Sequence, residues 1–145
     1  MSVPTILLVE DSPHDEVLTL RALKKVNISN NVVVVRDGQQ ALDYLFCSGE
    51  FADRDGPDLP TVVMLDINLP KVNGLDVLAR LRADPTTKLL PVVMLTSSDE
   101  EYDRLQSYKN GANSFVRKPL EFTEFAQTVA QLGIYWLAVN KPPFE

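Results

Sequence analysis

The sequence has too few cysteines for an intrachain disulfide bond and offers little for histidine-based chemistry. It contains one cysteine, Cys47, and one histidine, His14. Such cysteine usage is typical of a reducing compartment. A catalytic cysteine would need a base beside it, and nothing in the sequence pairs Cys47 with His14. We expect Cys47 to be a half-buried structural residue, because a free cysteine behaves as a small hydrophobe.

Long hydrophobic runs and an excess of positive charge are also missing. The apolar runs fall far below the roughly 20 residues that span a bilayer, and no basic segment with an apolar stretch behind it opens the chain. We therefore expect a soluble, cytoplasmic protein with no membrane contact. Lysine and arginine number 14 against 20 acidic residues, a net charge of −6, which argues against nucleic acid as a partner.

What the sequence does contain is apolar material for one ordinary domain. Hydrophobic residues make up 45% of its 145 positions, enough for a sizeable core. Short runs rich in valine are apolar on both faces, as in parallel strands covered on both sides. These runs lie at 6–9, 32–35, 62–65 and 92–95, with a weaker fifth at 114–116.

Amphipathic stretches with helix start signals separate the runs. Ser12 precedes a proline, and Asp37 and Ser98 open capping-box patterns. In the helix after Ser98 we expect Tyr102 and Leu105 to face the core. The order is therefore (βα)₅, and right-handed crossovers place helices on both faces of a five-stranded parallel sheet.

Polar side chains follow the predicted strands, at the edge where such sheets bind ligands. Glu10 and Asp11 follow the first strand, Asp66 the third, Thr96 ends the fourth, and Lys118 follows the fifth. Each alone has an ordinary explanation as a cap or a turn residue. Together, the three carboxylates would repel one another unless a cation lay between them. The pattern therefore predicts a divalent metal site.

Mg²⁺, or Mn²⁺ in its place, prefers oxygen ligands and keeps several waters. Asp11 and Asp66 would each supply a carboxylate oxygen, and Asn68 its backbone carbonyl. Glu10 would act through a water.

A carboxylate beside such a metal can attack phosphorus and form an acyl phosphate, here on Asp66. The transferred group carries negative charge on three oxygens. The metal would meet one of them, Lys118 a second, and Thr96 with a backbone N–H the third.

The sequence resembles the bacterial receiver (response regulator) domains over residues 4–139. The matching motifs are ILLVEDSPHD, VVMLDINLPKVNGLDVL, VVMLTSS and GANSFVRKPL. We therefore expect a single receiver domain over 1–145, with a tail at 140–145, and a flavodoxin-like fold with strand order 2-1-3-4-5.

The resemblance also implies roles for individual residues. Glu10 and Asp11 would be the acidic metal pair, Asp66 the phosphoacceptor, and Lys118 the family's lysine. Thr96 would be the switch hydroxyl. The switch aromatic would be Phe115, and the loop after the phosphoacceptor would include Pro70 and Gly74.

Within the family, the chain is most similar to the small single-domain response regulators of cyanobacterial and bacterial phytochromes. The features are the ILLVEDSP start, the long connection at 47–60, the DPTTKLLPVVMLTSS run and the ending around 136–143. The resemblance implies a sensor histidine kinase, of the phytochrome type, as phosphoryl donor. The protein would signal by conformational switching through protein contacts or phosphorelay. It would be no enzyme beyond metal-dependent self-phosphorylation and autodephosphorylation.

The last predicted helix carries apolar residues at every position from 134 to 139. A helix that buries one face needs only a stripe, so some of these residues should point outward and mark an interface. We predict a homodimer through this stretch. The alternatives are that the tail folds back on its own domain, that the patch binds the kinase, or that the fourth helix supplies the dimer contact.

Two other classes share part of this pattern. A phosphatase of the haloacid dehalogenase type also uses Asp, a hydroxyl, Lys and Mg²⁺, but it needs a second Asp two residues after the nucleophile, where this chain has Asn68. A flavodoxin would bind its phosphate in the loop after the first strand. Here that loop begins with Glu10 and Asp11, which repel phosphate.

Overall fold

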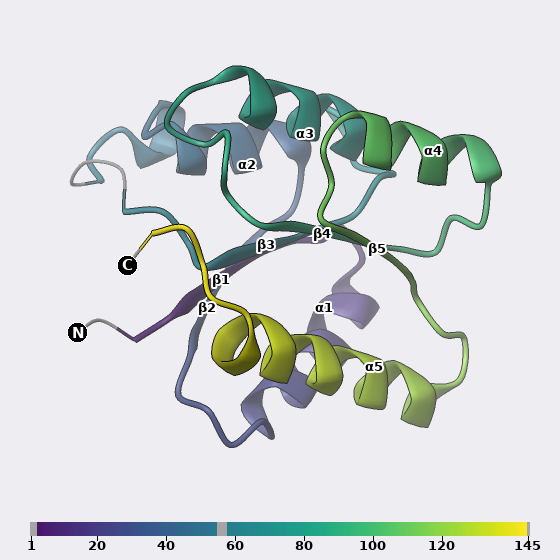
Figure 1. Cartoon of the computed structure of the whole chain (residues 1–145). Coiled ribbons are helices and arrows are strands. Elements are labelled where there is room, and N and C mark those ends of the chain that lie inside the picture. Colours follow the sequence, from purple (N-terminus) through teal and green to yellow (C-terminus); the bar gives the residue numbers. More distant parts are fainter. Residues whose placement is uncertain (1–2, 55–57, 145) are drawn as a thin grey trace.

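The computed structural model describes residues 3–54 and 58–144. Over these residues, five strands alternate with five α-helices, as the sequence predicted (Figure 1). The strands are β1 (Thr5–Val9), β2 (Asn31–Val35), β3 (Val62–Leu65), β4 (Val92–Thr96) and β5 (Ser114–Arg117). The helices are α1 (Pro13–Lys24), α2 (Gly38–Leu45), α3 (Gly74–Ala83), α4 (Glu101–Lys109) and α5 (Phe122–Ile134), with a 3₁₀ turn η1 (Gly49–Phe51) and a π-helical turn η2 (Tyr135–Val139).

The strands form one parallel sheet in the order β2-β1-β3-β4-β5, which confirms the predicted flavodoxin-like topology. Helices α2, α3 and α4 cover one face, and α1 and α5 cover the other (Figure 1). Within the described residues, no helix has the length and hydrophobicity needed to cross a membrane.

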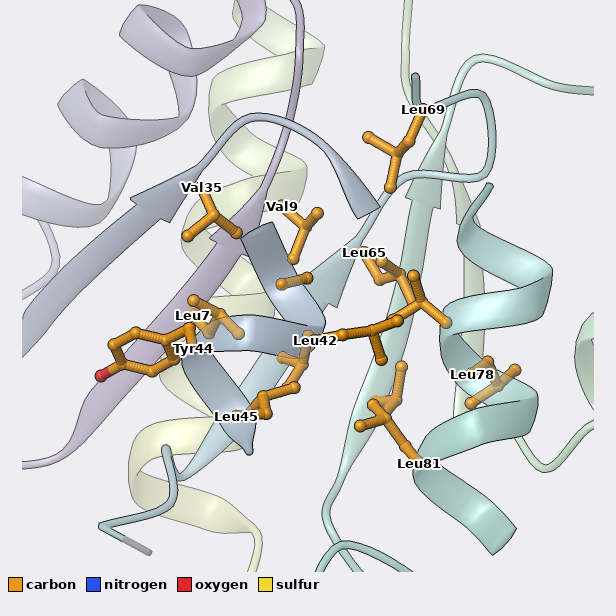
Figure 2. Close-up of a cluster of buried hydrophobic side chains, with 14 of the residues drawn as sticks. Leu7, Val9, Val35, Leu42, Tyr44, Leu45, Leu65, Leu69, Leu78 and Leu81 are labelled. Carbon is orange, nitrogen blue, oxygen red and sulfur yellow. The ribbon is translucent and has the colours of Figure 1, made fainter. Parts of the chain in front are cut away.

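The core consists of two hydrophobic clusters, one on each face of the sheet. Successive residues of a strand point to opposite faces, so Leu7 of β1 lies in the α2/α3 cluster and Leu8 in the α1/α5 cluster. Figure 2 shows side chains from β1, β3, α2 and α3 converging in the first cluster, among them Leu42, Leu65 and Leu78. This two-sided burial is the reason that the three central strands β1, β3 and β4 are almost entirely apolar, whereas the edge strands β2 and β5 are only partly buried.

Two of the three predicted helix starts are confirmed by their hydrogen bonds. Ser12 Oγ accepts the Asp15 N–H at 3.2 Å, and Asp37 Oδ1 accepts the Gln40 N–H at 2.7 Å. The third prediction, a cap at Ser98, was wrong: the cap residue of α4 is Glu100, and its side chain makes no capping bond. Ser98 lies two residues earlier, where its Oγ accepts the Glu100 N–H at 3.3 Å.

The expectation that Tyr102 and Leu105 face the core was wrong. They are 65% and 50% exposed, and the one buried residue of α4 is Ser107. The residue that α4 buries is therefore a small serine, whereas its large side chains Tyr102, Leu105 and Tyr108 are exposed to solvent.

The C-terminal residues fold partly back onto their own domain. Trp136 is buried, Leu137 packs against the α1/α5 cluster, and Phe144 packs against the cluster on the opposite face. Ile134 and Tyr135 stay exposed. Only part of the predicted apolar patch is therefore available to a partner.

The connection at 47–60 is held by Arg54, although residues 55–57 lie outside the described ranges. Its guanidinium lies 3.7 Å from the centre of the Tyr44 ring and donates to the Asp58 carbonyl at 2.8 Å. Cys47 is half-buried, as expected, with its sulfur 3.7 Å from Arg54 Nη1.

Gly74 brings the start of α3 against the backbone of the loop after β3. Its N–H donates to the Ile67 carbonyl at 2.7 Å. A Cβ at this position would lie 2.0 Å from the carbonyl oxygen of Asp66. Only a glycine fits here without a shift of the backbone.

We expect Gly74→Ala to lower the free energy of unfolding by about 3 kcal/mol, because the new methyl group meets backbone that cannot turn away. Gly133→Ala is the matched control. Its Cβ would meet the movable Leu23 Cδ2 at 3.0 Å, so its effect should stay within about 1 kcal/mol. Urea unfolding of both variants measures the difference, and equal stabilities would refute the close approach at Asp66.

Candidate functional site

The structure brings the predicted site residues to one edge of the sheet. Glu10 and Asp11 follow β1 and Asp66 follows β3, and one carboxylate oxygen from each lies within 4.8 Å of the others. Glu10 and Asp66 are buried, whereas Asp11 is exposed. Two acidic groups are thus fixed by the core, and the third faces solvent.

Lys118 lies among these carboxylates and is only 4% exposed. Its Nζ donates to Oδ2 of Asp66 at 2.9 Å, to Oδ2 of Asp15 at 2.9 Å, and to Oε1 of Glu10. The Lys118 backbone N–H donates to the Thr96 carbonyl at 2.7 Å, which fixes the lysine to the end of β4. The ammonium group therefore offsets part of the negative charge of the site.

Asp66 is held at both carboxylate oxygens. Oδ1 accepts the Ile67 N–H at 2.7 Å, and Oδ2 accepts from Lys118. A carboxylate fixed in this way is oriented before any substrate arrives.

Burial raises the pKa of the Glu10 carboxyl to about 7. Lys118 opposes this rise, and the charge of Asp66 adds to it. Burial by itself would lower the pKa of Lys118, but the charge of Asp66 and the hydrogen bonds to three carboxylates outweigh it and raise the pKa above its ordinary value. Lys118 is therefore a permanent cation in this site, while Glu10 can gain a proton near neutral pH.

The remaining predicted residues surround this cluster at different depths. Thr96 is fully buried, and its Oγ1 accepts the Ser98 N–H at 3.2 Å. Phe115 is half-buried on β5 and packs against the α2/α3 cluster. Asn68 is exposed two residues after Asp66.

Sequence reasoning missed Asp15. It lies in the first turn of α1, where an acidic residue is ordinarily explained by the helix dipole. The Ser12 cap starts the helix shortly after β1, but it gives no indication of where the Asp15 side chain points.

Comparisons with known proteins identify the family of the chain. The chain matches the model of the response regulator receiver domain over residues 6–130. It is 36% identical to the response regulator Rcp1 of Synechocystis sp. over 132 residues, which cover 91% of this chain and 88% of Rcp1.

Solved structures of response regulators have the same fold. The phosphorylated cyanobacterial phytochrome response regulator RcpA superposes with a TM-score of 0.92 at 36% identity, covering 99% of this chain and 100% of RcpA. The Mn²⁺-bound form of Rcp1 superposes with a TM-score of 0.91 at 34% identity, covering 97% of this chain and 99% of Rcp1. The bacteriophytochrome response regulator RtBRR superposes with a TM-score of 0.77 at 51% identity, covering 98% of this chain and 85% of RtBRR.

Replacing Lys118 by methionine should destabilise the protein in a pH-dependent way. At pH 8 we expect Lys118→Met to lower the free energy of unfolding by about 3 kcal/mol, because buried carboxylates lose their cation. Consider a carboxyl group whose pKa is higher in the folded than in the unfolded protein. At low pH it is protonated in both states and does not affect the free energy of unfolding. That free energy falls as the pH rises from the unfolded pKa to the folded pKa. That pKa is about 7 for Glu10 even with Lys118 present, so the loss should be smaller at pH 5.

Urea unfolding at pH 5 and pH 8 with a chelator present measures this difference. Arg117→Met is the control, because its side chain is 53% exposed and pairs with Asp99 at the surface. It should change stability by at most about 1 kcal/mol at either pH. An equal loss for Lys118→Met at both pH values would contradict the role of the buried carboxylates.

Proposed function

Because the chain belongs to the response regulator receiver domain family, we propose that it accepts a phosphoryl group on Asp66 from a sensor histidine kinase. One observation carries the proposal. The Asp66 carboxylate follows β3 and accepts a hydrogen bond from Lys118. One of its oxygens lies within 4.8 Å of a carboxylate oxygen of Glu10 and of Asp11. This arrangement supports a nucleophilic role for Asp66, neutralisation of charge by Lys118 and metal binding by the acidic residues.

We propose that a divalent cation, Mg²⁺ or Mn²⁺, binds at this acidic cluster. The donor set suits it, because oxygens from Glu10, Asp11 and Asp66 gather within 4.8 Å and hard divalent cations prefer oxygen ligands. The backbone carbonyl of Asn68 would complete the protein ligands. The relative Rcp1 has been solved with Mn²⁺. The ion would supply positive charge against a phosphoryl oxygen.

The chain's own residues account for the rest of the transfer. An Asp66 carboxylate oxygen would attack phosphorus, forming an O–P bond as the bond between phosphorus and the donor breaks. Lys118 would give up one of its carboxylate hydrogen bonds to contact a phosphoryl oxygen and neutralise part of its charge. The Thr96 hydroxyl would donate to another oxygen of the same group.

We further propose that the donor is a phytochrome-type kinase. The support is that RcpA is a cyanobacterial phytochrome response regulator and RtBRR a bacteriophytochrome response regulator, and both align over almost all of this chain. No observation favours a phosphatase of the haloacid dehalogenase type, since Asn68 offers no carboxyl for proton transfer.

Acetyl phosphate with Mg²⁺ should label the protein, and Asp66→Asn should abolish the labelling, because an amide is a far weaker nucleophile than a carboxylate. A chelator should have the same effect on the unmodified protein. Phosphate-affinity gels measure the labelled fraction. Asp53→Asn, at an exposed position, is the matched control and should label normally. Undiminished labelling of Asp66→Asn would refute the phosphoacceptor.

A panel of purified histidine kinases that includes a phytochrome-type kinase tests the donor separately. The phytochrome-type kinase should transfer its phosphoryl group faster than the others at equal concentrations. If another kinase in the panel is faster while acetyl phosphate still labels Asp66, the donor assignment fails and the phosphoacceptor stands.

We propose that phosphorylation is transmitted through Thr96 and Phe115. Thr96 would move toward the phosphoryl group and leave space that the Phe115 ring fills, which shifts the surface of α4 and β5. Chemical-shift changes on phosphorylation should therefore include residues 98–118, and Thr96→Ala should reduce them. Changes confined to the strand ends would contradict this pathway.

We propose that the protein forms a homodimer through the exposed part of its C-terminal stretch. Ile134, Tyr135 and Val139 are 46%, 47% and 60% exposed. Tyr135→Asp with Val139→Asp should dissociate the dimer, because charges would enter an apolar contact. Tyr102→Asp with Leu105→Asp on α4 is the matched pair. The solution mass of each variant across a dilution series shows which surface forms the contact. If the unmodified protein is a monomer at tens of micromolar, the homodimer proposal is wrong.

A further inference from the structure

Lys118 has no hydrogen left for a phosphoryl group. An ammonium group has three N–H donors, and Glu10, Asp15 and Asp66 accept one each. Any phosphoryl oxygen that binds Lys118 must therefore displace one of these carboxylates. Which carboxylate resists displacement affects how readily the site accepts the group.

The three carboxylates differ in what else holds them. Glu10 also accepts the Ser12 N–H at 3.1 Å, and Asp66 accepts the Ile67 N–H at 2.7 Å. Both would also face the metal ion in the function proposed above. Among the described residues, the Asp15 side chain has one hydrogen-bond partner, which is Lys118. Its carboxylate is thus dedicated to the lysine.

Asp15 also lies on the outer side of the cluster. Its side chain is 24% exposed, whereas those of Glu10 and Lys118 are 2% and 4% exposed. It lines a cavity of about 240 Å³ together with Lys118, Ser97 and Phe122. A negative charge there stands beside the lysine that an incoming phosphoryl group, itself negative, has to reach.

We propose that Asp15 is a positioning residue that restrains Lys118 and slows phosphorylation of Asp66. It holds one hydrogen of the ammonium group away from the phosphoryl oxygen and adds a negative charge near the transferred group. This inference rests on the proposed phosphoacceptor role of Asp66. In the transfer from acetyl phosphate, the O–P bond to Asp66 forms, the donor's P–O bond breaks, and acetate leaves with the electron pair. Asp15 takes no part in the bond changes.

The test compares acetyl phosphate labelling rates at saturating Mg²⁺. Asp15→Asn keeps the shape and removes the charge, and we expect the rate to rise between about three- and tenfold, as loss of one repulsive charge at this range would give. The increase should shrink at high salt, because the charge is partly exposed to solvent. Asp15→Glu should restore a rate close to that of the unmodified protein.

Glu16→Gln is the matched control. Glu16 is the neighbouring acid in the same helical turn, but it pairs with Arg36 at 3.0 Å. Glu16→Gln removes one negative charge from the first turn of α1, as Asp15→Asn does, but Glu16 makes no hydrogen bond to Lys118. The labelling rate should therefore not change. Asp15→Ser provides a second variant without the charge, and should Asp15→Asn fail to fold it must show the same increase.

A second measurement is independent of phosphorylation. In the metal-free protein, proton exchange of the Lys118 ammonium group with water, followed by NMR, should be faster in Asp15→Asn and unchanged in Glu16→Gln. A labelling rate in folded Asp15→Asn that equals or falls below that of the unmodified protein, or an equal increase in Glu16→Gln, would overturn the proposal. If the unmodified protein does not label at all, the phosphoacceptor role itself fails.

Discussion

A buried ammonium group surrounded by carboxylates is the interaction on which this site depends. Glu10 and Asp66 are almost fully removed from water, and Lys118 pairs with both of them and offsets part of their charge. Buried ions of one sign are strongly destabilising without a partner of the other sign. Lys118 therefore stabilises the buried carboxylates, and the proposed phosphoryl transfer would require these hydrogen bonds to rearrange.

The fold holds these charges in place through backbone contacts that tolerate no extra atoms. Gly74 packs against the Asp66 carbonyl, and a Cβ on Gly38 would lie 1.8 Å from the Val72 carbonyl oxygen. The loop after β3 is thereby fixed between the starts of α2 and α3. Helix α4 covers the same face of the sheet as α2 and α3, but the one residue that it buries is Ser107. The shift of α4 proposed above would therefore move the helix that buries the fewest side chains.

Much of the fold could be predicted because its signals are local. Valine-rich runs predicted the strands, because successive side chains point to opposite faces and a strand covered on both faces is apolar at every position. The caps at Ser12 and Asp37 predicted two helix starts, because a capping bond forms within one turn of the chain. Tyr102 and Leu105 were misplaced because the periodic pattern of α4 does not reveal how closely that helix approaches the sheet. The partial return of the C-terminal residues onto the domain was one of the alternatives that the sequence left open, because Phe144 packs against residues distant in the chain.

The sequence by itself determined which chemical groups meet, because parallel strands in a (βα)₅ order bring their carboxyl ends to one edge. Glu10, Asp11, Asp66 and Lys118 were placed together on that ground alone. Only the tertiary structure decided how they pair. The bond between Lys118 and Asp15 joins residues 103 positions apart, and a bond of that kind depends on side-chain direction and depth, which the packing of α1 on the sheet sets and no sequence pattern records.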